Sequence, residues 1–147
     1  MTHLKEGDKA PDFLQAMSGI DSNSYAGKKV ILYFYPKDNT PGCTAEACNL
    51  RDNYEELKDK GYEVIGVSPD SEKKHENFSA KHELPFHLIP DTEKALLEAY
   101  GVWGEKKMYG KTYMGVQRTT FVIAEDGTIE KIFKKVKTKE HAQQILK

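Results

Sequence analysis

This sequence has few cysteines, no long apolar run and no excess of charge of either sign. Its 147 residues include only two cysteines, and 22 basic against 23 acidic side chains leave a net charge of −1. Two cysteines exclude the dense disulfide framework of a small secreted scaffold, and the balanced charge gives no field that would attract nucleic acid or a membrane surface. The longest apolar run, Val30 to Tyr35, is far shorter than the roughly 20 residues that cross a bilayer.

We expect one domain over residues 1–147 that works in the cytoplasm. The length is sufficient to bury a core without disulfides, and no repeat, low-complexity tract or long linker divides the chain. Its first residues, MTHLKEGDK, lack the apolar segment of a secretion signal. In a reducing compartment, two cysteines are more often catalytic, redox-sensing or metal-binding than structural.

Both cysteines lie in the segment from Thr40 to Cys48, which also carries the signal for a helix start. Thr40 suits the N-cap, where its hydroxyl can cap the helix, and Pro41 suits the first helical position. Cys43 then falls in the first turn. The free N–H groups there and the positive end of the helix dipole favour the reactive thiolate over the thiol.

Apolar residues recur at steps of four and three from Cys43 onward, which predicts that Cys43 begins the buried face of the helix. The stripe consists of Cys43, Ala47, Leu50, Tyr54 and Leu57. Helix geometry places Cys48 about 140° around the axis from Cys43 and roughly 8.7 Å away between Cα atoms, whereas a disulfide tolerates at most about 7 Å. The two thiols can therefore join only if the first turns unwind. A static disulfide or two inert buried thiols remain the alternatives.

The spacing of the candidate ligands argues against a zinc site. Zinc ligands usually come as two close pairs, whereas here one pair of cysteines is accompanied by five scattered histidines. His75 and His82 lie seven residues apart, a spacing that we interpret as a solvated helix face. Neither a metal nor a cofactor is expected.

Strand and helix patterns alternate along the chain. Strands are expected at 30–35, 62–68, 85–89, 119–123 and 128–133, helices at about 41–60, 71–82, 91–100 and 138–147, and a short hairpin within 10–29. The order βαβα, then an antiparallel hairpin, then α predicts the α/β class, with a mixed central sheet and helices on both faces.

With a cysteine at the start of the helix after the first long strand, the chain resembles proteins of the thioredoxin fold. Residues 36–43, PKDNTPGC, match the P-x-x-x-T-x-x-C signature of peroxiredoxins. The longer string to Cys48 resembles the peroxiredoxin Q or bacterioferritin comigratory protein branch. Arg118, directly before the strand expected at 119–123, agrees with the same family.

The resemblance implies a thiol-dependent peroxidase that reduces hydrogen peroxide and organic hydroperoxides in antioxidant defence. Cys43 would be the peroxidatic nucleophile, Thr40 and Arg118 its activators, and Pro36 a shield for the pocket. Cys48 would resolve the Cys43 sulfenic acid as an intramolecular disulfide, which a thioredoxin-type donor would reduce. A monomer is expected because resolution needs no second subunit.

Non-catalytic interpretations stay open for single residues, and other function classes stay open for the whole chain. Thr40 could be only a cap and Arg118 only a surface charge. Glu46 could bond to Arg118, or it could be there only because the helix dipole favours an acidic residue in the first turn. A thioredoxin-type thiol-disulfide exchanger is disfavoured because C-x-x-C is missing, and a redox-sensing or chaperone-like binding module is the second function class.

Overall fold

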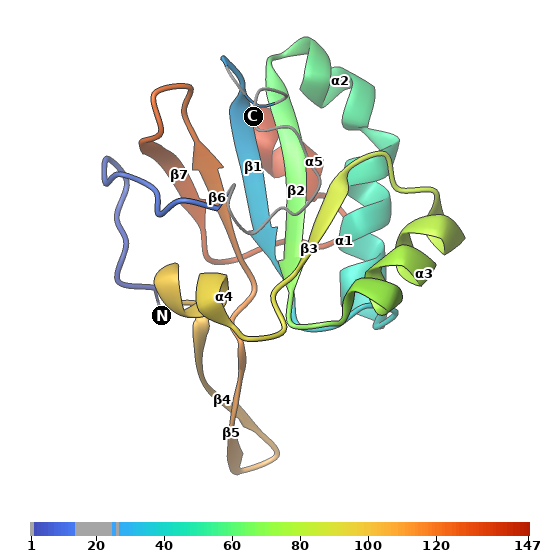
Figure 1. Ribbon diagram of the computed structural model, residues 1–147, viewed down its shortest axis with the longest axis vertical. Coiled ribbons are helices and arrows are strands. Elements are labelled where there is room, and N and C mark those ends of the chain that lie inside the picture. Colours follow the sequence, from blue (N-terminus) through green and yellow to red (C-terminus); the bar gives the residue numbers. More distant parts are fainter. Residues whose placement is uncertain (1, 14–24, 26) are drawn as a thin grey trace.

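The computed structural model describes residues 2–13, 25 and 27–147, and its central element is a five-stranded mixed sheet (Figure 1). The strand order is β3-β2-β1-β6-β7, with β1 parallel to β2 and antiparallel to β6. The strands are β1 Lys29–Phe34, β2 Tyr62–Ser68, β3 His87–Pro90, β6 Thr119–Ile123 and β7 Ile129–Phe133; the helices are α1 Pro41–Asp52, α2 Tyr54–Asp59, α3 Glu72–His82, α4 Ala95–Ala99 and α5 His141–Leu146. The predicted α/β class and mixed sheet are confirmed.

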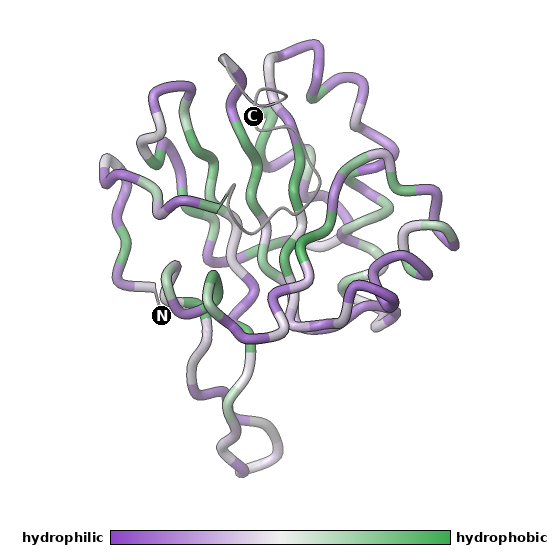
Figure 2. Tube along the Cα trace, viewed as in Figure 1, coloured by the Kyte–Doolittle hydropathy of each residue, from purple (hydrophilic) through white to green (hydrophobic). Residues whose placement is uncertain are grey.

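The central strand β1 sends alternate side chains into two cores, one on each face of the sheet. Ile31 and Tyr33 pack in a cluster with residues of α1, α2, α3 and α5, whereas Leu32 and Phe34 pack with Leu97 of α4 and with its neighbours. Helices thus cover both faces, as predicted, and Figure 2 shows the apolar strands between them. This burial of both faces explains the continuous apolar run in β1.

The helix expected over 41–60 is two helices, α1 and α2, separated at Asn53. The Asn53 side-chain amide donates to the carbonyl of Asn49 at 2.8 Å, and such a local bond competes with the helical ladder. Gly61, with φ of +88°, follows the end of α2 in the left-handed region that favours glycine. The predicted stop at this glycine is therefore correct, but the single long helix is wrong.

The start of one helix and the structure of residues 103–116 also differ from expectation. Asp91 does not begin α4; its carboxylate instead accepts the N–H groups of Leu96 and Leu97 across the preceding turn, at 3.2 and 2.8 Å. Residues 103–116, for which no strands were expected, form a separate antiparallel hairpin of β4 (Trp103–Met108) and β5 (Lys111–Val116). This hairpin extends away from the rest of the molecule and exposes Tyr109 at its tip (Figure 1).

Most of the hairpin expected within 10–29 lies outside the described residues. In the described part, the N-terminal segment instead joins the sheet edge: Lys9 forms an isolated antiparallel bridge with Thr128, and the Gly7 N–H donates to the Ile129 carbonyl at 2.8 Å. Over the described ranges, we find no helix with the length and apolarity needed to cross a bilayer.

Candidate active site

Cys43 lies in the first turn of α1 with only 1% of its surface exposed. Thr40 occupies the N-cap and Pro41 the first helical position, as predicted, and the Thr40 carbonyl accepts the Thr44 N–H at 2.9 Å. The Thr40 hydroxyl, however, does not cap the helix, because it donates to the Lys37 carbonyl at 2.9 Å. Its oxygen therefore keeps its acceptor capacity for a ligand.

Arg118, the residue directly before β6, reaches Cys43. In the antiparallel register of β1 and β6, Phe34 pairs with Thr119, so Arg118 lies where the chain leaves β1 for the loop before α1. Its Nη2 donates to Cys43 Sγ at 3.2 Å. A Cβ on Gly42 would come within 3.3 Å of that same nitrogen, so the glycine leaves room for the guanidinium against the helix start. The interpretation of Arg118 as only a surface charge is therefore wrong.

Glu46 is the second partner of Arg118. The carboxylate, fully buried one turn after Cys43, accepts Arg118 Nη1 at 2.6 Å. Burial raises the pKa of Glu46 to about 7, although the positive charge and hydrogen bond of Arg118 oppose the shift. Burial opposes charge on Arg118 as well, yet Glu46 and Cys43 raise the pKa of the guanidinium. One guanidinium is thus shared between the carboxylate and the sulfur.

The other oxygen of Glu46, Oε2, has no hydrogen-bond partner in the described part of the chain and lies 3.7 Å from Nε2 of buried His141. Burial lowers the pKa of His141 to about 4, so the ring is neutral and forms no ion pair at neutral pH. Its Nδ1 lies 2.9 Å from Gln144 Oε1, an acceptor, and its Nε2 lies 2.8 Å from the Thr120 hydroxyl. The ring therefore carries its hydrogen on Nδ1 and accepts the Thr120 hydroxyl at Nε2.

Replacing Glu46 with glutamine should change how stability depends on pH. Folded Glu46 binds its proton more tightly than the usual carboxyl with pKa 4.5, so its contribution to stability falls as pH rises from 4.5 to 7. The lowered pKa of His141 acts with the opposite sign between pH 4 and 6.5, so the two contributions offset one another in the wild type. In Glu46→Gln only the histidine contribution remains. Between pH 4.5 and 6.5, the free energy of unfolding should rise by about 2 kcal/mol more than in the wild type.

Urea denaturation at a series of pH values measures this difference. Glu76→Gln, on the exposed face of α3, is the matched control and should follow the wild type. Parallel curves for Glu46→Gln and the wild type would contradict the shifted pKa of the buried carboxyl.

A buried polar cluster fixes the loop between β1 and α1. Asp38 accepts the Tyr35 hydroxyl at 2.6 Å and lies 2.7 Å from His75 Nδ1, while its own N–H donates to Asp70 at 2.7 Å. The solvated face predicted for His75 is therefore wrong, because only 4% of this residue is exposed. The ligand atoms of Asp38, Asp70 and His75 lie within 4.8 Å of one another, but each residue already has a protein partner. The cluster thus ties the loop to the sheet and to α3.

Cys48 lies on another side of α1 from Cys43, half buried, and both thiols are free. Its Sγ is 3.7 Å from Nδ1 of His82, the last residue of α3. His82 is only partly exposed, so the solvated face predicted for this histidine is also wrong. Pro36 follows Tyr35 beyond β1 and is half buried. The structure thus brings Arg118 to Cys43, whereas Cys48 has a separate partner.

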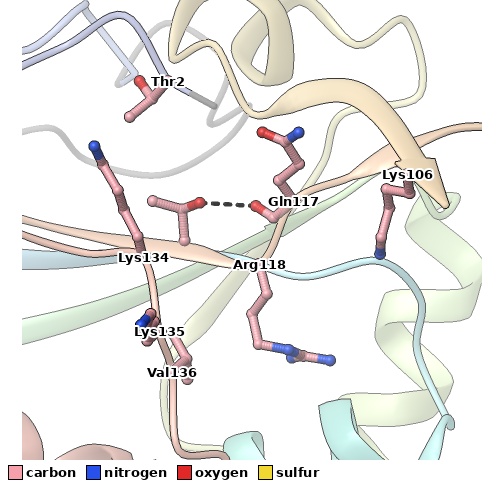
Figure 3. A pocket seen from close by; sticks show the side chains of 8 residues that line it. Thr2, Lys106, Gln117, Arg118, Lys134, Lys135 and Val136 are labelled. Atoms are coloured by element: carbon pink, nitrogen blue, oxygen red, sulfur yellow. Dashed lines mark hydrogen bonds between the residues drawn. The ribbon is translucent and has the colours of Figure 1, made fainter.

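A basic hollow of about 520 Å³ adjoins the site (Figure 3). It is lined by Thr2, Lys106, Gln117, Arg118, Thr119, Lys134, Lys135 and Val136. Figure 3 shows Arg118 extending away from Thr2 and Lys134, and Arg118 is the residue that the hollow shares with the contact at Cys43. A ligand in the hollow therefore meets positive charge.

Comparisons with known proteins agree with this geometry. A profile described as the AhpC/TSA family matches residues 7–132. The chain is 49% identical over 146 residues to Peroxiredoxin Bcp of Bacillus subtilis (strain 168), covering 97% of this chain and 93% of that protein. It is 45% identical over 149 aligned positions to Peroxiredoxin Bcp of Escherichia coli (strain K12), covering 99% and 96%.

Solved structures show the same relationship. The bacterioferritin comigratory protein of Xanthomonas campestris, in a structure that addresses its alkyl peroxide reduction activity, matches with a TM-score of 0.78 and 41% identity over 84% of this chain and 79% of that one. A mutant of PrxQ from Xylella fastidiosa matches with a TM-score of 0.86 and 31% identity over 99% and 95%.

A mixed sheet with a cysteine at the start of the helix after β1, and an arginine on its sulfur, defines a thioredoxin-like thiol peroxidase. The chain belongs to the AhpC/TSA family and, within it, to the peroxiredoxins of the Bcp and PrxQ type. It is an oxidoreductase that uses a peroxide substrate and a thiol reductant. The alternative of a redox-sensing or chaperone-like module is not favoured.

Proposed function

We propose that Cys43 is the peroxidatic nucleophile and that Arg118 and Thr40 activate it. One observation carries this assignment: Arg118 donates to Cys43 Sγ at 3.2 Å while its other terminal nitrogen is held by buried Glu46 at 2.6 Å. A guanidinium cannot lose its proton, so it keeps a fixed positive charge on the sulfur and favours the thiolate.

In the reaction, the Cys43 thiolate attacks one oxygen of the hydroperoxide and the O–O bond breaks. The sulfur bonds to the attacked oxygen and becomes a sulfenic acid, and the other oxygen leaves as hydroxide or alkoxide, which takes a proton from solvent to become water or an alcohol. Arg118 stabilises the charge that develops on the oxygens. The Thr40 oxygen accepts a hydrogen bond from the substrate, since its own proton is used on Lys37. Pro36, half buried just beyond β1, shields the pocket from water.

Cys48 then resolves the sulfenic acid. Its sulfur bonds to that of Cys43 and water is released, after the first turns of α1 unwind to close the distance between the two thiols. A thioredoxin-type dithiol reduces the resulting disulfide. Because both sulfurs belong to one chain, a monomer suffices, and the need for a thiol reductant favours the cytoplasm.

Intact mass spectrometry tests this cycle. The reduced chain is treated with one equivalent of hydrogen peroxide and then with N-ethylmaleimide under denaturing conditions. The expected product is a monomer about 2 Da lighter than the reduced chain and without alkylation at Cys43 or Cys48. A disulfide-linked dimer as the main product would rule out intramolecular resolution.

A further inference from the structure

The Cys48 thiol has a titratable partner on a different helix. His82 Nδ1 lies 3.7 Å from Cys48 Sγ, within the range of a hydrogen bond to sulfur. Two contacts fix the position of this residue: the His82 carbonyl accepts Arg51 Nη1 at 2.7 Å, and the Phe78 ring packs edge-on against the imidazole with centroids 4.9 Å apart. The first contact fixes the backbone of His82 and the second packs against its ring beside the sulfur.

The surroundings of His82 keep the ring neutral. Burial lowers the pKa of His82, and the positive charges of Lys81 on α3 and Arg51 on α1 lower it further. Glu83, the next residue, interacts with Arg51. His82 Nε2 is buried without a hydrogen-bond partner among the described residues. The ring can therefore carry its hydrogen on Nε2 and present the Nδ1 lone pair to the Cys48 thiol.

We propose that His82 is the general base of the resolution step, a role that rests on the proposed function of Cys48. His82 Nδ1 takes the thiol proton, and the Cys48 thiolate attacks the sulfur of the Cys43 sulfenic acid. The S–S bond forms as the S–O bond of Cys43 breaks, and the leaving hydroxide takes the proton from the imidazolium to become water. Cys48 is oxidised and the sulfenic sulfur reduced, so no further reagent is needed.

The anchoring of α1 explains how this contact can persist while the helix unwinds. Arg51, one turn after Cys48, bonds to the His82 carbonyl and so ties the second half of α1 to α3. Cys43 lies in the first turn, on the other side of Cys48 from this tie. Unwinding the first turns therefore moves Cys43 while Cys48 stays beside its base.

The rate of alkylation of Cys48 tests its interaction with His82 without any peroxide chemistry. In a Cys43→Ser background Cys48 is the only thiol, and its rate of reaction with iodoacetamide reports how readily this thiol gives up its proton. An ordinary thiol is only about 3% thiolate at pH 7. We therefore expect His82→Gln to lower the rate at pH 7 by roughly tenfold and to remove its plateau toward lower pH. His87→Gln, at an exposed histidine of β3, is the control and should leave the rate unchanged.

The resolution step itself is followed by acid quenching and mass spectrometry in chains that keep both cysteines. His82→Gln should slow disulfide formation by roughly tenfold and leave sulfenic acid formation unchanged. Added imidazole should restore the rate in His82→Ala, which a purely structural role would not allow. Alkylation rates equal within about twofold in the presence and absence of His82 would overturn the inference and leave the proposed function intact. A wild type that forms no disulfide would overturn the proposed function and this step with it.

Discussion

Replacing Cys43 with serine is expected to abolish peroxide reduction at any concentration of reductant. A serine at this position keeps the shape of the side chain, but its hydroxyl is not ionised near neutral pH, and among the described residues the hydrogen-bond partner of the sulfur is an arginine rather than a base. The contact of Arg118 with Cys43 would favour an anion, yet it cannot ionise an alcohol at this pH. Turnover is measured with thioredoxin and its reductase, using both hydrogen peroxide and an alkyl hydroperoxide.

Cys48→Ser is the matched comparison, because it removes the other thiol of the same helix. This variant should lose turnover driven by thioredoxin but still consume about one equivalent of peroxide, since formation of the sulfenic acid does not involve Cys48. Full activity in Cys43→Ser would contradict the assignment of the nucleophile. Unchanged thioredoxin-driven turnover in Cys48→Ser would contradict the assignment of the resolving thiol.

Local signals in the sequence were enough to predict the scaffold of the site. The cap position of Thr40 and the proline after it predicted where α1 begins. The apolar stripe predicted the buried side, and Cys43, Ala47 and Leu50 of α1 and Leu57 of α2 are indeed buried. The burial of β1 followed from its uninterrupted apolar residues. These features depend on residues close together in the sequence, where backbone geometry decides the outcome.

Contacts between distant segments could not be predicted in the same way. Asp38 in the β1–α1 loop contacts His75 of α3, and Cys48 of α1 contacts His82 of the same helix α3. One signal was nevertheless present: His75, Phe78 and His82 recur at steps of three and four, the spacing of a buried helix face. The charged residues around them in α3 concealed that stripe. A histidine in line with a buried phenylalanine thus indicated a core contact more strongly than a solvated face.

The resemblance to peroxiredoxins pointed to Arg118, and the structure shows contacts of this side chain that a simple positive charge could not make. Its two terminal nitrogens serve different partners, the Cys43 sulfur at 3.2 Å and the Glu46 carboxylate at 2.6 Å. The carboxylate is fully buried and Cys43 nearly so. The planar guanidinium therefore holds the Cys43 sulfur and compensates a buried charge at the same time.

Replacing Arg118 with lysine is accordingly expected to lower kcat/KM for peroxide by roughly 100-fold, and replacing it with methionine by roughly 1,000-fold. An ammonium cannot span both partners, so the lysine either leaves buried Glu46 unpaired or leaves the sulfur. Alkylation of Cys43 at pH 7 should slow in both variants, because the thiolate loses its fixed cation.

Lys131→Met, which removes an exposed cation from β7, is the control for net charge and should retain wild-type kcat/KM. Thermal unfolding separates chemistry from folding, since a variant that is folded at the assay temperature but slow has lost transition-state stabilisation. If Arg118→Met kept its kcat/KM within about threefold of the wild type, the guanidinium would be structural, and the Cys43 thiolate would depend on the helix start alone. A loss that is larger for methionine than for lysine, with alkylation slowed in parallel, is the pattern that only direct stabilisation of the sulfur and the departing oxygen produces.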